Sequence, residues 1–446
     1  TIRFGPGLSA FFEEKRHMPK AQPVTPILMV DQERCILCAR CTRFGELIAG
    51  DHALEIFERG DRSHIGCAAE KSREAFKFLG NTIAICPVGA LTSRVYRFRA
   101  RPWDNAAHPT VCSLCPVGCS LVLDQRDGEI VRTRAGQDPT VNDMWLCDKG
   151  WFGYEHLKSD ERLKEPLVKR GGTFHPISWQ EAISLATDAL KKSIPGKKIA
   201  GWGGSPLTIE ENYLFQKLIR EGCGVSHLEH RFGLPRLSAS EEGLSPGMEG
   251  SIADLEQISW GWVFGVDITE EFPILWLRLQ MAIQKGAALT FFGHMAPERR
   301  NSFEKEHLHL PGEEWMVIQK VIQEPPPTSK GGGALFVGGS YLRSLKRHHI
   351  LAELLRWSRT HGVALHLLEA KNNSLGARLA GMLPDRGPFS SALPQRGFFV
   401  EEVLKTTLQE GWDFLYIAGV DLLRYFPTEL LLQARKNLGF LLVQEL

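Results

Sequence analysis

From about residue 166 to its end, the chain alternates between two hydrophobic patterns. One is a short, continuous apolar run, which is typical of a strand buried on both faces of a sheet. The other places apolar residues at helical spacing, as at Ile183, Ala186 and Leu190. This alternation predicts a doubly wound, mostly parallel α/β sheet in two lobes. The predicted strands lie within 260–267, 288–294, 334–340, 363–370, 414–421 and 439–446.

Capping signals predict where two of the helices begin. Ser178 with Glu181, and Thr208 with Glu211, have the spacing of a capping box, in which the two side chains satisfy backbone N–H groups of the first turn. The second of these helices is expected to end at Gly222.

The first part of the chain has a different pattern. Residues 1–105 are basic and rich in loops, and 119–135 contain two apolar stretches separated by Asp127-Gly128, which predicts a β-hairpin. The Pro-rich stretch 324–333 is typical of a linker. We therefore expect four regions, namely a cluster-binding region at 1–105, a compact unit at 106–165, and two α/β lobes at 166–325 and 326–446.

Charge and hydropathy exclude some functions. The chain has 53 basic and 52 acidic residues, and its net charge of +1 gives no electrostatic reason to expect binding to nucleic acid or to acidic lipid. No apolar run approaches the roughly 20 residues that a membrane helix needs. The most apolar stretch, 274–292, is interrupted by Arg278 and Lys285. We expect a soluble chain that meets a membrane only through partners.

The cysteines carry the chemical signal, because eight of the ten form two sets with iron–sulfur spacing. In each set three cysteines share one short loop and the fourth follows later in the chain. The fourth cysteine of the first set precedes Pro87, as the remote ligand of such clusters commonly does. The first set is Cys35, Cys38, Cys41 and Cys86, and the second is Cys112, Cys115, Cys119 and Cys147.

Two [4Fe–4S] clusters are the cofactors that this spacing predicts. Structural zinc is the alternative, but zinc sites usually pair two C-x-x-C knuckles or mix cysteine with histidine. Disulfides fit less well, since ten cysteines in 446 residues are no disulfide scaffold. Four thiolates fill the coordination of a cube, so we expect electron transfer without a substrate site on this chain.

Motifs spread along the chain resemble the large iron–sulfur subunit of bacterial respiratory complex I, the NADH:quinone oxidoreductase. The later half is similar to the molybdopterin-oxidoreductase fold that this subunit carries after its clusters. The motifs that carry the resemblance are ERCILCARC, ERG, GN with ICPVGAL, RFRARPW, CSLCPVGC, LCDKGWFGYEH, PLVKRGGTFHPISWQEAI, GVDITEEFPIL and NNSLGARLAGMLPD.

The resemblance implies a function, partners and a location. It implies that the chain relays single electrons from the flavin side through the first cluster, with the second cluster off the main path. The implied partners are a flavin-bearing, NADH-oxidising subunit, a small binuclear-cluster subunit and the quinone-side peripheral subunits. The implied location is peripheral, on the cytoplasmic side of the bacterial inner membrane.

The chain also departs from the family pattern. Members of the family begin with a ferredoxin-like domain that holds a binuclear cluster, followed by a cube bound by one histidine and three cysteines, and neither motif occurs here. We expect segments before Thr1 and after Leu446 to be missing.

Whether the molybdopterin-like half binds a metal depends on its ligand position. In catalytic relatives a cysteine or selenocysteine follows the helix that ends here near Gly222, whereas this sequence has Gly233 and Leu234 near that position. Cys223 lies about ten residues too early. His227 and His230 are the possible substitutes, although lone histidines are usually structural. We expect no molybdopterin.

Four further features have a structural interpretation beside a functional one. We expect Cys67 to be a packing residue or a free thiol, and Lys149, which resembles a lysine between cluster and pterin in catalytic relatives, to soften the field of the second cluster. The glycine-rich 201–205 and 337–340 are expected to form tight turns rather than phosphate cradles. The arginines of 97–103 either balance reduced clusters or grip an acidic partner.

Two other functions stay open at this point. One is a molybdenum or tungsten subunit of the formate dehydrogenase type, and the other is a relay subunit of an NAD-linked hydrogenase. Metal analysis with formate-dependent dye reduction would test the first. The neighbouring genes would discriminate best, since antiporter-like membrane subunits favour complex I.

Overall fold

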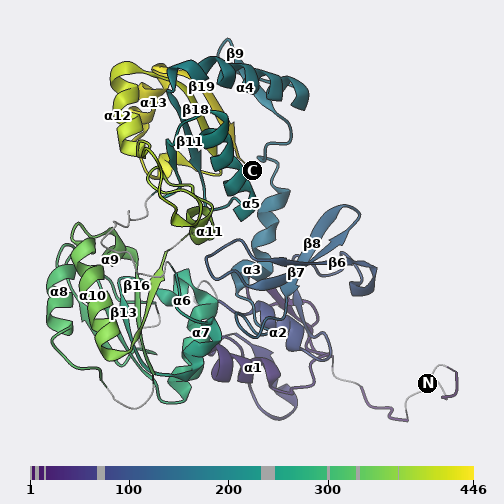
Figure 1. The fold of residues 1–446 in the computed structure, drawn as a ribbon. Helices are drawn as coiled ribbons and strands as arrows, with labels where there is room; N and C mark the ends of the chain where they lie inside the picture. The colour runs from purple at the N-terminus through teal and green to yellow at the C-terminus, as the bar shows by residue number, and fades with distance from the viewer. Residues whose placement is uncertain are drawn as a thin grey trace. The chain divides into compact units, whose positions relative to one another are not determined.

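The computed structural model describes residues 3–5, 10–14, 17–67, 76–232, 247–298, 302–327, 332–369 and 371–445. The chain divides into two compact units (Figure 1). The first comprises Thr1–Pro109, Val122–Ala135 and Trp145–Phe152. The second comprises Thr110–Leu121, Gly136–Met144 and Gly153–Leu446. Within the described residues no helix combines the length and the apolar character needed to span a membrane.

The first unit consists of short elements, as expected where the sequence has no long apolar run. An antiparallel sheet has the strand order β1-β2-β5, and β3 pairs with β4 in a hairpin. Leu28, Leu54, Ile65 and Leu91 form its core together with Cys41. The bounds are β1 Gln22–Pro23, β2 Leu28–Val30, β3 Glu55–Phe57, β4 His64–Gly66, β5 Leu91–Ser93, α1 Arg40–Phe44 and α2 Gly80–Ile85.

The predicted hairpin is confirmed. Strands β7 (Ser120–Arg126) and β8 (Glu129–Ala135) flank Asp127 and Gly128, whose φ angles of 50° and 84° are those of a two-residue turn that matches the twist of the strands. β6 (Ala106–Val111) lies at the edge of this sheet, in the order β6-β7-β8. The Thr133 hydroxyl of β8 contacts the carbonyls of Gly150 and Trp151 at 2.7 Å each, which fastens helix α3 (Asp148–Phe152) to the hairpin.

The second unit contains two parallel sheets. The first sheet has the order β12-β11-β18-β19, and its residues alternate between two cores. Phe414, Tyr416 and Ala418 of β18 face one core, and Leu415 and Ile417 face the other, as the period of two in a strand requires. The strands are β11 Ile199–Gly203, β12 Leu228–Glu229, β18 Trp412–Ala418 and β19 Leu438–Gln444, and the helices are α4 Trp179–Ser193, α5 Ile209–Lys217, α11 Ser374–Leu379, α12 Val400–Glu410 and α13 Thr428–Lys436.

The second sheet, called here the inserted sheet, has the order β15-β14-β13-β16-β17. Trp260, Trp262 and Phe264 of its central strand pack with Leu354 and Trp357 of α10 in one large core. The strands are β13 Ile258–Phe264, β14 Ala288–Gly293, β15 Lys305–Leu308, β16 Gly332–Gly338 and β17 Ala364–Leu368. The helices are α6 Ile268–Glu271, α7 Pro273–Gln284, α8 Glu314–Val321, α9 Gly339–Arg343 and α10 Arg347–His361, and a separate hairpin is formed by β9 Leu167–Arg170 and β10 Thr173–Pro176.

All six predicted buried strands are present, and both predicted helix starts are confirmed. The N–H of Glu181 donates to Ser178 Oγ at the start of α4, and Thr208 with Glu211 forms a complete capping box at α5.

The boundary expected at 325/326 does not separate the two sheets. β16, which follows it, pairs in parallel with β13, which precedes it, whereas β11 pairs with β18. The inserted sheet therefore lies in sequence between β12 and β18. Strand pairing over such separations depends on which apolar edges fit together, and local punctuation such as a Pro-rich stretch does not reveal it. Residues 328–331 of the expected linker lie outside the described residues.

Each sheet has a switch point, where chain connections lead outward in both directions and where ligands bind in many doubly wound proteins. In the first sheet it lies between β11 and β18. There, a Cβ atom added to Gly204 would lie 1.8 Å from the carbonyl oxygen of Gly419. In the inserted sheet it lies between β13 and β16, and a Cβ on Gly339 would lie 1.9 Å from the oxygen of Gly265. At both points the two backbones touch, so these glycines form tight turns, as expected.

Replacing Gly204 with alanine should therefore destabilise the second unit. The contact is with backbone, which cannot rotate away, so we expect a loss of roughly 2–3 kcal/mol. For a domain of this size that corresponds to a fall of about 5–10 °C in the thermal midpoint.

The matched control is Gly222→Ala, whose Cβ would meet only Leu218 Cδ1 at 3.4 Å. It should leave the midpoint unchanged or slightly raised, because alanine is favoured over glycine in helical backbone. Equal midpoints for the two variants would contradict the close contact at the switch point.

Candidate iron–sulfur sites

The structure brings all four cysteines of the first set to one hollow in the first unit. The remaining lining is largely apolar and includes Val30, Ile65 and Leu91. Cys41 is buried, and the other three thiols are partly exposed. The four lining cysteines are Cys35, Cys38, Cys41 and Cys86.

The loop that carries the first three cysteines is tightly curled. Leu37 and Ala39 lie between them with φ angles of 50° and 59°, in the left-handed region that residues other than glycine seldom adopt. Left-handed residues among right-handed ones turn successive N–H groups toward one side, an arrangement found around phosphates and iron–sulfur clusters. The Leu37 N–H bonds to the thiol of Cys35, and the Thr42 N–H bonds to that of Cys41. These backbone donors favour the thiolate forms.

Burial opposes those donors. It raises the pKa of the Cys35 thiol and raises that of Cys41 to about 11, and the neighbouring cysteines add to both shifts. Close thiolates in an apolar hollow repel one another unless positive charge lies between them. The donor set thus fits an iron–sulfur cube, which needs four thiolates around a core of cationic iron.

Single metal ions have no comparable place. Over the ranges of the chain that the structure describes, no group of three or more His, Cys, Asp or Glu side chains is arranged to hold one ion. The first set surrounds a space instead of meeting at a point. All ten cysteines are free of disulfides.

Helix α2 positions the remote ligand, since Cys86 directly follows its last residue and adopts an extended conformation before Pro87. The other end of α2 is held by the Asp148 carboxylate, which accepts from the N–H groups of Leu79 at 3.0 Å and Gly80 at 2.7 Å. A carboxylate is favoured at this end of a helix. Burial nevertheless raises the pKa of Asp148 to about 7.

Two neighbouring contacts of α2 explain the Gly-Asn pair of the motif. A Cβ on Gly80 would lie 2.3 Å from the Trp151 ring, so only glycine fits there. The Asn81 amide donates to the Leu146 carbonyl at 2.8 Å and accepts from the Leu146 N–H at 3.0 Å. The segment 145–151 therefore fixes the direction of α2.

The second set is placed in two parts. Its first three members lie on the loop between β6 and β7, which is closed by a hydrogen bond of 2.8 Å from the Cys112 N–H to the Cys119 carbonyl. Gly118 provides a left-handed turn with φ 67°. Burial raises the pKa of the Cys112 thiol, opposed by the Leu114 N–H. Cys147 lies in the other compact unit, so its membership of this set stays a prediction from the sequence.

Other residues that the sequence singled out have structural surroundings. Cys223 is buried in the core between β11 and α5, and Cys67 packs against the core of the first unit without lining the hollow. His227 Nδ1 accepts from the Phe398 N–H at 2.8 Å, and burial lowers the pKa of His227 to about 4. Lys149 lies in α3, and its expected role stays a prediction.

His230 differs from the usual structural histidine. It is buried, and neither ring nitrogen has a hydrogen-bond partner among the described residues. Burial, with the charges of Arg231 and Arg378 nearby, holds the pKa of His230 far below its usual range, so the ring is neutral. The ligand position near Gly233 and Leu234 lies outside the described residues.

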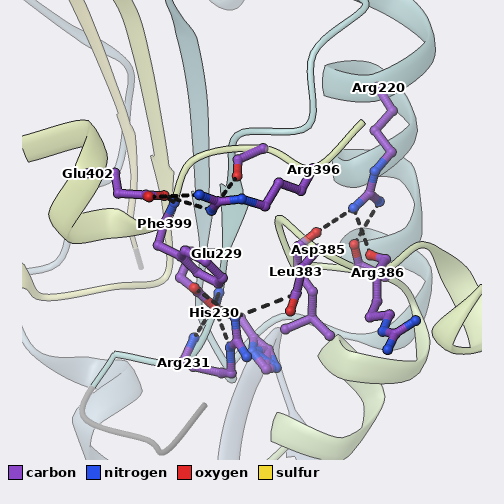
Figure 2. A network of polar contacts seen from close by, with 12 residues as sticks. Arg220, Glu229, His230, Arg231, Leu383, Asp385, Arg386, Arg396, Phe399 and Glu402 are labelled. Atoms are coloured by element: carbon purple, nitrogen blue, oxygen red, sulfur yellow. Dashed lines mark hydrogen bonds and ion pairs between the residues drawn. The ribbon is translucent and has the colours of Figure 1, made fainter. Parts of the chain in front are cut away.

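Charges around His230 are largely paired within the chain, as Figure 2 shows. Arg231 makes two bonds to the Glu229 carboxylate, at 2.8 and 3.0 Å, with both side chains buried. Arg378 pairs with Glu369 in the same region. Arg220 donates to backbone carbonyls of Gly381, Leu383 and Arg386. Such paired, buried charges stabilise the local packing rather than offer free charge to a ligand.

Comparison with known families gives three matches in chain order. The family "NADH-quinone oxidoreductase subunit 3, ferredoxin-like domain" matches residues 25–92. The "Molybdopterin oxidoreductase Fe4S4 domain" matches 106–159, and "Molybdopterin oxidoreductase" matches 162–313. The first match spans all members of the first cysteine set, and the second spans all members of the second set.

Full-length relatives extend the same result. An NADH-quinone oxidoreductase subunit of Streptomyces coelicolor is 33% identical over 423 residues, which cover 87% of this chain and 49% of the relative. Subunit 3 of the Thermus thermophilus enzyme is 39% identical over 274 residues, 61% of this chain and 34% of the relative. The alpha subunit of NADPH-Fe(3+) oxidoreductase from Geobacter sulfurreducens is 32% identical over 309 residues, 67% and 36% of the two chains.

The chain spans about half or less of the length of these curated relatives. Its ferredoxin-like match precedes its molybdopterin-type Fe4S4 match, and the doubly wound region follows both. In sequence and in the order of its domains, the chain is thus a relative of the large iron–sulfur subunit of bacterial NADH-quinone oxidoreductase, the protein named subunit 3 in Thermus thermophilus.

Proposed function

We propose that the chain is an electron-relay subunit of an NADH:quinone oxidoreductase. The observation that carries this proposal is the hollow of the first set, where four cysteines from two distant parts of the sequence face one apolar space. A [4Fe–4S] cluster held there would accept and release one electron at a time.

The chain's own residues would set the conditions for that transfer. The N–H groups of Leu37 and Thr42 lie next to thiol sulfurs, and such hydrogen bonds favour the reduced, more negative state of a cluster. The lining side chains Val30, Ile65 and Leu91 keep water from the inner thiols. Four cysteine ligands would leave no iron open to substrate.

A second cluster is proposed at Cys112, Cys115, Cys119 and Cys147, off the main path. Its support is the match of 106–159 to a molybdopterin-type Fe4S4 domain and the closed loop from Cys112 to Cys119. No molybdopterin is proposed for the doubly wound region. Support comes from the backbone contacts at both switch points and from the paired charges around His230.

Partners and location follow the names of the relatives. We propose assembly with a flavin-bearing NADH-oxidising subunit, a binuclear-cluster subunit and quinone-side subunits, on the cytoplasmic side of the bacterial inner membrane. The likeness to the NADPH-Fe(3+) oxidoreductase subunit supports a second candidate, a relay in an enzyme that reduces a different acceptor. Electron acceptance by quinone in the purified complex distinguishes the two.

Anaerobically prepared chain should contain about eight irons and eight acid-labile sulfides, as two complete cubes require. The measurement is colorimetric iron and sulfide analysis with zinc determined in parallel. The control is Cys67→Ser, which lies outside both sets and should keep the full content. About four irons, or zinc in place of iron, would show that one set is misassigned.

Replacing Cys38 with alanine should abolish NADH-to-quinone transfer in the assembled complex. NADH oxidation with an artificial acceptor that takes electrons at the flavin should survive, because the interruption lies downstream of the flavin. Both rates are measured on the same complex preparation, and Cys223→Ser is the control. Loss of both activities in a fully assembled complex would argue against a downstream relay.

Replacing Cys115 with alanine should lower the thermal stability of the region around 106–165, because a bound cluster contributes folding free energy as structural metal does. Turnover per assembled complex should stay unchanged. NADH:quinone activity is therefore normalised to the amount of complex while unfolding is followed by calorimetry. Unchanged stability with lost turnover would put the second cluster on the electron path.

A further inference from the structure

Residues 94–103, called here the arginine loop, leave strand β5 and are held firmly in place. The Arg97 guanidinium donates to Thr92 Oγ1 at 3.2 Å, and the Arg97 N–H bonds to the Ser93 carbonyl at 3.0 Å. Tyr96 accepts from the Asn105 amide at 2.9 Å, and the Arg132 guanidinium of β8 lies 4.5 Å from the centre of its ring. The loop is thus fixed on the β7–β8 hairpin within the first unit.

This fixed loop displays two large aromatic rings. Phe98 is 84% exposed and Trp103 is 78% exposed. Phe98 also has a φ of 65°, a left-handed conformation that is unusual for a bulky residue and carries a free-energy cost. Rigid loops that spend stability to expose an aromatic ring are a feature of functional surfaces.

The guanidiniums of the loop are the second part of the surface. That of Arg97 lies 4.8 Å from the Phe98 ring centre, and that of Arg101 lies 5.9 Å from the Trp103 ring centre. The adjacent Asp104 is already paired with Arg126, at 2.9 Å. In the described part of the chain, none of the loop's four arginines forms an ion pair with a carboxylate; they are Arg94, Arg97, Arg99 and Arg101.

The loop's arginines do not serve the first cysteine set directly. The residues that line its hollow include Arg40 but none of the four arginines of the loop. Of the two roles open from the sequence, balancing a reduced cluster therefore has no support in these contacts. Gripping a partner fits the exposed rings as well as the free charges.

We propose that the arginine loop is a docking surface for a partner protein that presents a carboxylate-rich segment. Arginine and aromatic side chains are the residues most enriched at the energetic centres of protein interfaces, and guanidinium forks bind carboxylates with two hydrogen bonds. Because the loop is already ordered, docking costs little conformational entropy. A nucleic acid is disfavoured, since the chain as a whole has a net charge of only +1.

The test places a photo-crosslinking phenylalanine analogue at Phe98 of the full chain, in cells that make its native complex. After irradiation, mass spectrometry identifies the attached molecule. We expect an adduct with a segment rich in Asp and Glu in another polypeptide. The control carries the analogue at Phe174, which is 64% exposed with Lys169 Nζ 5.4 Å from its ring, and should not label that segment.

Charge reversal then tests the arginines. Arg99→Glu with Arg101→Glu should reduce the adduct at least about tenfold, which corresponds to 1.4 kcal/mol of binding free energy. Lys169→Glu should not reduce it. An unaltered thermal midpoint and iron content show that the variants fold and keep their clusters, so this outcome is read separately from the electron-transfer proposal.

Three results would overturn the inference. The first is an adduct with nucleic acid or lipid, and the second is an adduct only within the chain itself or none at all. The third is a crosslink yield that charge reversal leaves unchanged in folded protein. Restoration of the adduct by lysine substitutions in the labelled acidic segment would identify the pairing residues.

Discussion

The hollow of the first cysteine set depends on the direction of helix α2. That helix is too short to be stable by itself, and it ends at the cysteine that faces the loop of the other three. Its direction is set by segment 145–151, through the Asp148 carboxylate at its first N–H groups and the Trp151 ring against Gly80. A change in this contact would rotate Cys86 away from its three partners. The candidate site is therefore supported from outside the ferredoxin-like match, by residues that belong in sequence to the next region.

Both parallel sheets keep the architecture of a ligand-binding fold while their switch points are closed by backbone. The glycines responsible follow a common pattern, since one strand at each switch point continues into Gly-Gly-Ser and the other into Gly-Val-Asp. Asp267 and Asp421 of the latter each accept a hydrogen bond from the backbone two residues on. The two sheets are built as variants of one plan, with its two halves in opposite chain order. This internal repeat is readable in the sequence at 203–205, 265–267, 338–340 and 419–421, although it emerges only once the sheets are seen.

Local features of the fold could be predicted because they depend on local chemistry. Continuous apolar runs revealed six buried strands, and Asp127-Gly128 revealed the hairpin. β11 was missed because its five residues include two glycines and form no clear apolar run. The pairing of β11 with β18 could not be read either, because pairing of distant strands depends on packing and not on neighbouring residues.

The same division applies to the candidate site. Cysteine spacing selected the four residues that line the hollow, because the geometry of a cube restricts that spacing. The left-handed backbone at Leu37 and Ala39 left no trace in residue type, since neither is a glycine or asparagine. The supporting role of Asp148 was equally hidden, because it arises from contact between segments far apart in the chain. The unpartnered ring of His230 likewise required the surrounding structure to be known.

The insertion of one sheet within the other has a consequence for synthesis on the ribosome. Ile199 of β11 lies opposite Phe414 of β18, so the first sheet cannot close until the whole inserted sheet has been made. At roughly 5–20 residues per second, the roughly 200 residues between them take about 10–40 s to translate. During that interval the inserted sheet can fold while β11 remains an unpaired, apolar strand. Such a strand is a binding site for chaperones and a starting point for aggregation. Translation speed across the inserted sheet thus becomes a determinant of how much of this protein reaches its folded state.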